Sequence, residues 1–422
     1  MLLAACGGDD DGGGGGGGSE DTGQTEGAKA VDPASMEGAK GNITYCTGKD
    51  TSGDLIAGVK DFNEKNPGLT AKLLEFPEAA DQQRNQFIQR QRAKSADCDV
   101  FEADVVWTAE FASQKWLMDM TPYMETRKAE FVPSTLESVT FEDKMWGAPR
   151  STDVGFLYYR TDQVDSVPAT WQEVYDLAAK NDGIVYQGAS YEGLTVNFLE
   201  LAFAAGGKVI SDDGKKPEIN SPENLKALEF MVAGVKDGAA PKAVTTYMEQ
   251  ESNNSFQAGK ATFMRQWPYA YALDNAKGSK VQGKFKVVPY PAFEGGGKAG
   301  ILGGHNMVIS SFSKNPGGAL KLIDYFTGAE VMLRAASEYS KAPTLVETYA
   351  DASIKEQEKG IPFLDELKVA VEQAKSRPVS PVYSQISQAI YKNVNEALSG
   401  AAEPKAALEK AEADMEKALA TF

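Results

Sequence analysis

The segment from residue 41 to residue 107 constrains the fold most strongly, because two kinds of apolar pattern alternate along it. Short runs rich in β-branched residues predict strands, and apolar residues at helical spacing predict helices. The elements follow as strand, helix, strand, helix and strand at 41–48, 55–62, 69–76, 81–96 and 100–106. This alternation predicts a doubly wound α/β sheet with helices on its faces.

A second stretch, residues 261–273, predicts where such a sheet offers a site. Ala261 to Met264 predicts a buried strand, and Pro268 suits the first turn of a following helix. Trp267 then lies at the carboxyl end of the strand, where open α/β sheets bind ligands. Its flat ring suits the apolar face of a sugar ring. From this stretch alone, a core tryptophan that caps the sheet is an equal alternative.

Charge and composition exclude several classes of function. The net charge of −17 argues against nucleic acid, whose phosphates need a basic surface. No apolar run reaches about 18 residues, so no transmembrane helix is expected. One histidine and three cysteines give no metal-spaced cluster and no Ser/His/Asp arrangement. We therefore expect no metal, no cofactor and no enzymatic activity.

Residues 1–40 predict a tether. Leu3-Ala-Ala-Cys6 has the small residues of a bacterial lipoprotein cleavage site, and a glycine-rich tract runs to Gly18. Such a tract cannot bury apolar surface and is expected to be disordered. We predict lipidation at Cys6, a signal peptide truncated at the recorded start, and a folded body that begins near Gly41. A chance match in a disordered tail is the alternative.

Cys46 and Cys98 then remain as a candidate disulfide pair outside the cytoplasm. Both lie on predicted strands, and parallel pairing of these strands would stagger the two positions. A bridge needs Cα atoms within about 7 Å of each other. The sequence leaves this disulfide open.

Six segments, taken together, resemble the extracellular solute-binding proteins of carbohydrate ABC importers, and the trehalose- and maltose-binding branch is the most similar. Each segment is weak alone, but the six follow the order of that family and cover the chain from Gly41 to its end. They are Asp104–Ala112, Thr152–Arg160, Asn197–Gly207, Phe263–Ala270, Gly303–Asn306 with Ser313–Asn315, and Arg377–Tyr383.

The resemblance implies a type II periplasmic-binding-protein clamshell of the α/β class. Each of its two lobes would be a doubly wound sheet with flanking helices, and three crossings would join them. The implied first lobe is 41–152 plus 290–328, and the second is 153–289 plus 329–422. The crossings are expected near 153–155, 287–291 and 327–339.

Sugar recognition combines aromatic rings, which stack on C–H faces, with charged groups that hydrogen-bond to hydroxyls. The resemblance implies that Trp267 stacks on the sugar and that Asp104 and Asp153 accept from its hydroxyls. Arg377 would donate two hydrogen bonds. The alternatives are a helix N-cap for Asp104, an inter-helix salt bridge for Arg377 and a solvated surface position for Arg84. The full candidate set is Lys49, Arg84, Asp104, Trp107, Thr152, Asp153, Trp267, Tyr269, Gly304, His305 and Arg377.

Two departures from the trehalose/maltose pattern leave the identity of the sugar open. His305 stands where similar proteins often have an aromatic residue, and Arg150-Ser-Thr-Asp153 stands where Trp-Tyr-Thr-Asp is typical. Both replace aromatic surface with polar groups, so a ligand with an anionic group near Arg150 is an alternative.

We expect a monomer that captures a di- or oligosaccharide with high affinity and delivers it to the permease subunits of an ABC importer. It would act in the periplasm or, through its lipid, on the outer face of the cytoplasmic membrane. The alternative ligands are a sugar phosphate, a glycerol-phosphate ester or a peptide. Glycoside hydrolysis by Asp104 and Asp153 is the least favoured reading.

Overall fold

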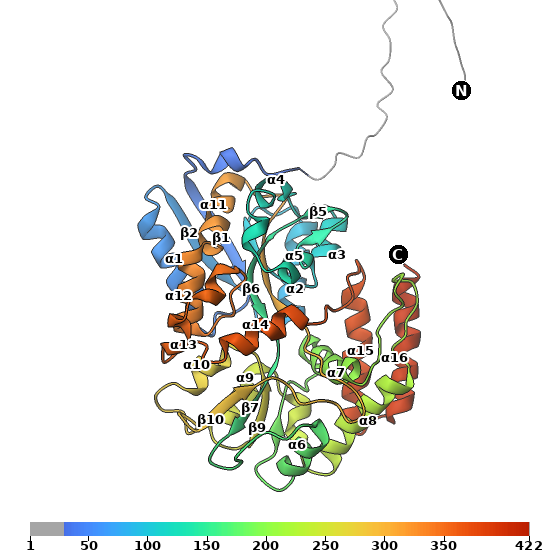
Figure 1. The fold of residues 1–422 in the computed structure, drawn as a ribbon. Coiled ribbons are helices and arrows are strands. Elements are labelled where there is room, and N and C mark those ends of the chain that lie inside the picture. The colour runs from blue at the N-terminus through green and yellow to red at the C-terminus, as the bar shows by residue number, and fades with distance from the viewer. Residues whose placement is uncertain (1–28, 422) are drawn as a thin grey trace, which may run out of the picture.

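Two separate sheets organise the chain into two lobes, one above the other in Figure 1. The structure is a computed structural model that describes residues 29–421. Cys6 and the part of the predicted tether up to residue 28 lie outside the described residues. The prediction that the folded body begins near Gly41 is wrong, because Val31 is buried in the core of the first lobe and its amide donates to the Asp119 carbonyl at 2.9 Å. No helix within the described part of the chain is long and apolar enough to cross a membrane.

The sheet of the first lobe has five strands, in the order β2-β1-β3-β11-β6. β1 pairs in parallel with β2 and β3, while β11 runs antiparallel to both β3 and β6. The predicted third strand ends two residues early, at Asp104. The strands are β1 (Gly41–Thr47), β2 (Leu69–Glu75), β3 (Val100–Asp104), β6 (Ala148–Asp153) and β11 (Gly303–Ile309).

Helices cover both faces of this sheet. One face packs against α1, α11 and α12 in a core that includes Phe62 and Phe326, and the other buries an aromatic group around Phe101 and Phe111. The helices are α1 (Asp54–Lys65), α2 (Ala80–Arg92), α3 (Thr108–Ser113), α11 (Pro316–Phe326) and α12 (Ala329–Tyr339). The smaller elements are η1 (Pro33–Met36), α4 (Thr121–Met124), η2 (Lys128–Glu130), α5 (Pro133–Glu137), β4 (Thr140–Phe141) and β5 (Lys144–Met145).

The sheet of the second lobe has four strands, in the order β10-β7-β9-β8. Only β8 and β9 pair in parallel, so this sheet is mixed rather than wholly parallel. The reason is topological, because β7 and β10 lie next to the crossings between the lobes. The strands are β7 (Phe156–Arg160), β8 (Ile184–Val185), β9 (Phe263–Gln266) and β10 (Phe285–Val288).

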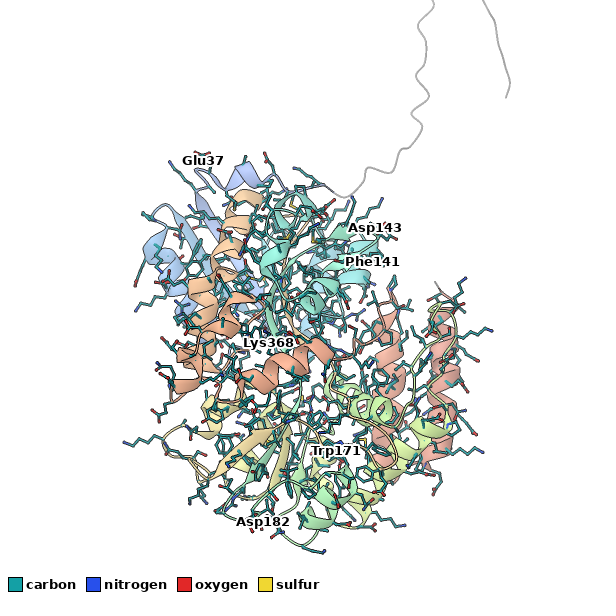
Figure 2. The ribbon with its side chains drawn as sticks, viewed as in Figure 1. Glu37, Phe141, Asp143, Trp171, Asp182 and Lys368 are labelled. Carbon is teal, nitrogen blue, oxygen red and sulfur yellow. A yellow bond between two sulfur atoms is a disulfide. The ribbon has the colours of Figure 1, made fainter. Side chains whose placement is uncertain are left out.

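The helices of the second lobe begin where the sequence provides caps. Ser221 accepts a hydrogen bond from the Asn224 amide at 3.2 Å, as predicted for the helix that follows it, and Thr170 forms a capping box with Glu173. Trp171, labelled in Figure 2, begins α6 and packs on Tyr290 with ring centroids 5.3 Å apart. These elements are α6 (Trp171–Ala178), α7 (Glu192–Ala204), α8 (Pro222–Lys236), η3 (Lys242–Thr246), α9 (Glu249–Gln257), α10 (Ala270–Asp274), α15 (Tyr383–Leu398) and α16 (Pro404–Leu419).

The chain passes between the sheets near residues 154–155 and again between β10 and β11. The third passage differs from the expectation, which assigned residue 329 onward to the second lobe. Val331 and Met332 of α12 pack in the core of the first lobe, so the chain leaves that lobe after α12. The apolar pattern predicted a packed helix there, but not which lobe it would join. η4 (Glu347–Ala350), α13 (Ser353–Glu356) and α14 (Leu364–Gln373) follow, and α14 lies across the junction of the lobes in Figure 1.

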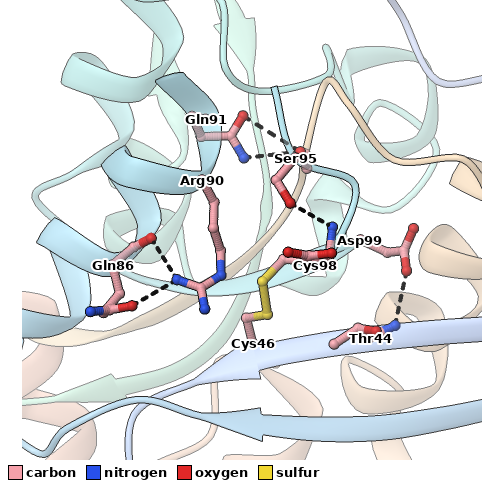
Figure 3. Close-up of a disulfide and its surroundings, with 10 residues drawn as sticks. Thr44, Cys46, Gln86, Arg90, Gln91, Ser95, Cys98 and Asp99 are labelled. Atoms are coloured by element: carbon pink, nitrogen blue, oxygen red, sulfur yellow. Dashed lines mark hydrogen bonds between the residues drawn. A yellow bond between two sulfur atoms is a disulfide. The ribbon is translucent and has the colours of Figure 1, made fainter. Parts of the chain in front are cut away.

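Cys46 and Cys98 form a disulfide with Cα atoms 5.8 Å apart (Figure 3). The expected stagger of the strands is present, since Cys46 pairs with Phe101. Cys98, however, is not on a strand but in the loop before β3, where the backbone can turn toward β1. Next to it, the Thr44 amide donates to Asp99 Oδ2 at 2.9 Å and joins the same two segments (Figure 3).

Candidate functional site

Polar residues meet at one edge of the first sheet because of its strand directions. β1 and β3 end at this edge, whereas the antiparallel β11 begins there, so His305 pairs with Asp104 and Gly303 with Asp153. Gly304 has φ +108°, and a Cβ there would lie 2.2 Å from the Ser151 carbonyl oxygen, so only glycine fits. We call this edge the first-lobe wall; its residues are Asp104, Asp153, Gly303, Gly304 and His305, with Lys49 and Lys341 beside them.

Aromatic residues form the facing surface on the second lobe. β9 ends at Gln266, and the half-buried Trp267 and Tyr269 occupy the turn before α10, close to the predicted arrangement. Tyr191 immediately precedes α7 and donates to Glu249 Oε2 at 2.6 Å. We call Trp267, Tyr269, Tyr191 and Glu249 the second-lobe wall.

A cavity of about 200 Å³ separates the two walls. An apolar cavity of about 150 Å³ is enough to hold a benzene molecule, so this space admits at least one six-membered ring. The remaining lining residues are Thr47, Gly48, Asp50, Thr51, Asp54, Leu55, Glu78, Ala80, Gln83, Glu102, Arg150, Ser151, Glu192, Gly193, Val196 and Arg377.

Arg377 joins the lobes at the end of the cavity. It is 4 % exposed, and it donates to Glu192 Oε1 at 2.6 Å on the second lobe and to Asp104 Oδ1 at 3.1 Å on the first. A further hydrogen bond of 3.2 Å runs from the Glu192 amide to Asp81 Oδ2 of the first lobe. Burial opposes the charge of Arg377, but the carboxylates of Asp104 and Glu192 raise its pKa above the usual value.

Comparison with known proteins identifies the family of this two-lobed chain. The sequence profile described as bacterial extracellular solute-binding protein matches residues 47–333. A probable ABC transporter-binding protein of Deinococcus radiodurans is 36% identical over 83% of this chain and 87% of its own length. The chain belongs to the bacterial extracellular solute-binding protein family. It is therefore a binding protein rather than an enzyme.

Solved structures show the same type II periplasmic-binding-protein fold. Maltose-bound T. maritima MalE3 superposes with a TM-score of 0.85 and 34% identity, over 89% of this chain and 99% of that one. A solute-binding protein of Thermotoga lettingae bound with alpha-D-tagatose gives 0.82 and 26% identity, over 90% and 99%. The predicted clamshell is thus confirmed.

The cavity of this binding protein is acidic. Eight carboxylate side chains line it, against four lysine and arginine side chains. Arg150 forms a buried ion pair with Asp54, and Arg377 is already paired, so among the four lining cations only Lys49 and Lys341 lack an ion-pair partner within the described residues. The positive charge of Arg150 is therefore already neutralised by Asp54 and does not favour an anionic ligand group there.

Asp153, like Asp54, is a carboxylate of the cavity with an oxygen that is unpartnered within residues 29–421. Its Oδ1 is buried and has no hydrogen-bond partner among the described residues. Burial raises its pKa to about 6, an effect that Lys341 and His305 partly offset. Near neutral pH this carboxylate is an unused acceptor beside Gly303 and Trp267.

Three of the predicted site residues do not line the cavity. The carboxylate of Glu110 pairs with Arg84 through two hydrogen bonds, so Arg84 is neither a ligand contact nor freely solvated. Trp107 is 5 % exposed, and its ring centroid lies 5.8 Å from that of Phe111 in the core, because the chain turns inward after β3. Thr152 is buried since side chains alternate along β6 and its neighbours Ser151 and Asp153 take the cavity side. The other eight predicted residues line the cavity: Lys49, Asp104, Asp153, Trp267, Tyr269, Gly304, His305 and Arg377.

Sequence reasoning missed several lining residues. Tyr191, Glu192 and Glu249 all stand at helix starts, the position at which a polar residue usually serves as a cap. Lys341 follows α12 and lies 5.0 Å from the centroid of the Tyr269 ring, a contact between the lobes. The only available signal was their place next to predicted element ends, which many surface residues share.

Proposed function

We propose that this protein captures a neutral sugar, a di- or oligosaccharide of the maltose or trehalose type, between its two walls. The observation that carries the proposal is the contrast between them: the tryptophan and both tyrosines of the lining belong to the second lobe, and Asp104 and Asp153 face them from the first. Rings suit the C–H face of a sugar, and carboxylates are strong acceptors for its hydroxyls.

Charge disfavours the phosphorylated alternative ligands. A sugar phosphate or glycerol-phosphate ester would enter a cavity whose carboxylates outnumber its cations, with both arginines already paired. No group of His, Cys, Asp and Glu within residues 29–421 could hold a metal ion. The maltose and tagatose bound by the two structural relatives agree with a neutral carbohydrate.

A thermal-shift screen over mono- and disaccharides tests the proposal, with glucose 6-phosphate and a tripeptide as controls. A ligand at about 100 times its Kd adds about 2.7 kcal/mol of stability, which gives a clear shift. Maltose or trehalose should raise the melting temperature, and the controls should not. A shift with glucose 6-phosphate alone would contradict a neutral ligand. Small-angle scattering with the sugar should also show a smaller radius of gyration than without it, because the ligand favours the closed state.

We also infer delivery to the permease subunits of an ABC importer and anchoring through a lipid on Cys6. The first rests on the name of the Deinococcus relative, and the second on Leu3-Ala-Ala-Cys6 and the glycine tract after it. Expressed behind a complete signal peptide, the protein should partition into detergent and Cys6→Ser should not. Equal partitioning of the two forms would contradict the anchor.

A further inference from the structure

A buried cation occupies one of the two faces of the Trp267 ring. Arg265 is two residues earlier on β9 and 3 % exposed, and its Cζ lies 4.0 Å from the centroid of the ring. A guanidinium at this distance is attracted to the π-electrons of the ring, and this attraction opposes a tilt of the ring away from the guanidinium. Only the opposite face is left for a ligand.

Three hydrogen bonds fix the guanidinium of Arg265. Glu200 on α7 accepts from Nε at 2.9 Å and from Nη2 at 2.6 Å, and Gln187 Oε1 accepts from Nη1 at 3.0 Å. Both acceptors are buried. This fork needs the planar geometry of arginine, which lysine cannot reproduce.

The same cluster touches two of the crossings between the lobes. Tyr290, which follows β10, donates from its hydroxyl to Glu200 Oε2 at 3.0 Å. Gly155 lies between β6 and β7, where a Cβ would meet the Tyr290 hydroxyl at 1.9 Å and Arg265 Nη2 at 2.7 Å. The close approach of the cluster is therefore the physical reason for glycine at this crossing.

The far edge of the Trp267 ring reaches the first lobe. A Cβ built on Gly303 would lie 3.0 Å from Cζ3 and 3.1 Å from Cη2 of the ring. The ring is thus held by Arg265 on its own lobe and lies against β11 of the other.

We propose that Arg265 is a positioning residue for the ligand, an inference that rests on the proposed function. Arg265 acts through Trp267, and Glu200 and Tyr290 fix its position relative to the crossings between the lobes. Arg265 draws π-electron density to its own side, so the open face of Trp267 favours neutral C–H groups over a second cation. The ring is set at the correct angle before a sugar arrives, which lowers the entropy lost on binding.

A double-mutant cycle measured with maltose by calorimetry tests this role. Arg265→Lys should weaken binding about tenfold with Trp267 present and less than twofold in the Trp267→Ala background, because the effect passes through the ring. Equal weakening in both backgrounds, or none in either, would overturn the proposal. Arg265→Met combined with Glu200→Gln is the second variant if Arg265→Lys fails to fold, since it leaves no buried charge unpaired.

Acrylamide quenching of the ligand-free protein supplies a measurement that needs no sugar. The difference in emission between each protein and its Trp267→Phe form isolates the signal of Trp267. Arg265→Lys should increase the quenching of that signal, whereas an unchanged signal contradicts a positioning role. Arg160→Lys is the matched control, because Arg160 makes a similar paired contact with Asp162 on the same lobe but has no tryptophan beside it. If maltose does not bind the wild type, maltose fails as the ligand while quenching still decides the role of Arg265.

Discussion

The two walls of the cavity are built by different means. The first-lobe wall consists mainly of strand ends, so its polar groups are held by sheet register, as in the pairing of His305 with Asp104. The second-lobe wall consists of turns and helix starts, and its rings depend on buried polar contacts such as that between Arg265 and Trp267. From this comparison we propose a division of roles: the first wall supplies most of the directional acceptors, and the second supplies most of the apolar contact area.

The largest expected effect concerns the covalent link beneath the first-lobe wall. The disulfide joins cysteines that are 52 residues apart in sequence, and loop-closure entropy for such a span corresponds to about 4 kcal/mol. Cys46→Ser with Cys98→Ser should lower the free energy of unfolding of the first lobe by up to this amount. Calorimetric scans should show the first-lobe transition moving to lower temperature. Because no other disulfide occurs between residues 29 and 421, a shift confined to the second lobe would contradict the assignment.

Trp267→Ala tests the apolar role of the second-lobe wall. Loss of a buried ring face is worth about 2–3 kcal/mol, so sugar affinity should fall roughly 30- to 200-fold. The melting temperature of the ligand-free protein should change little, because Trp267 is only half-buried. Trp107→Ala is the matched control: its buried ring should cost about 3–5 kcal/mol of stability without entering the cavity. Reversed results would exchange the assigned roles of the two tryptophans.

These two tryptophans also show how far the sequence reaches. Both follow predicted strands, and that local pattern places each at the end of its strand. It does not say that the chain turns inward after β3, so that Trp107 packs on Phe111, while the turn after β9 leaves Trp267 toward the cavity. The direction depends on contacts with distant residues, which periodicity does not contain.

The same limit applies to charged groups. The sequence predicted Arg377 near the ligand, but its partner Glu192 is 185 positions away and carries no local signal. The order of elements along residues 41–106 was predictable from their apolar patterns, but the strand order in the sheet was not, because β3 pairs with β1 rather than with β2 before it. The position of α12 was not, since its apolar face would suit either lobe.

Asp153 provides a test of the acceptor role of the first-lobe wall. Its pKa, raised by burial to about 6, means that a proton occupies the carboxylate increasingly as the pH falls through that value. If the ionised form accepts from a sugar hydroxyl, affinity should be roughly tenfold lower at pH 5 than at pH 7. Calorimetry across this range checks it, with Asp153→Asn expected to flatten the profile. His305→Gln is the control, and a profile flattened by that variant alone would assign the pH dependence to His305.

The smallest effect concerns Asp274, at the end of the helix that follows Trp267 and Tyr269. It is 0% exposed, and neither carboxylate oxygen has a hydrogen-bond partner within the described part of the chain, whereas the buried Glu200 of the same lobe is fully paired. Burial raises the pKa of Asp274 well above the value of about 3.9 in an unfolded chain. Between the unfolded and the folded pKa of Asp274 the folded state holds the extra proton, so the stability of the second lobe should fall as the pH rises.

Asp274→Leu removes this penalty, and the second-lobe melting temperature should therefore rise by about 2 °C at pH 8 and hardly change at pH 4. Glu200→Gln should do the opposite at pH 8, because it leaves Arg265 unpaired. A lower melting temperature for Asp274→Leu at pH 8 would mean that the carboxylate has a stabilising partner, and that the second-lobe wall rests on one more polar contact.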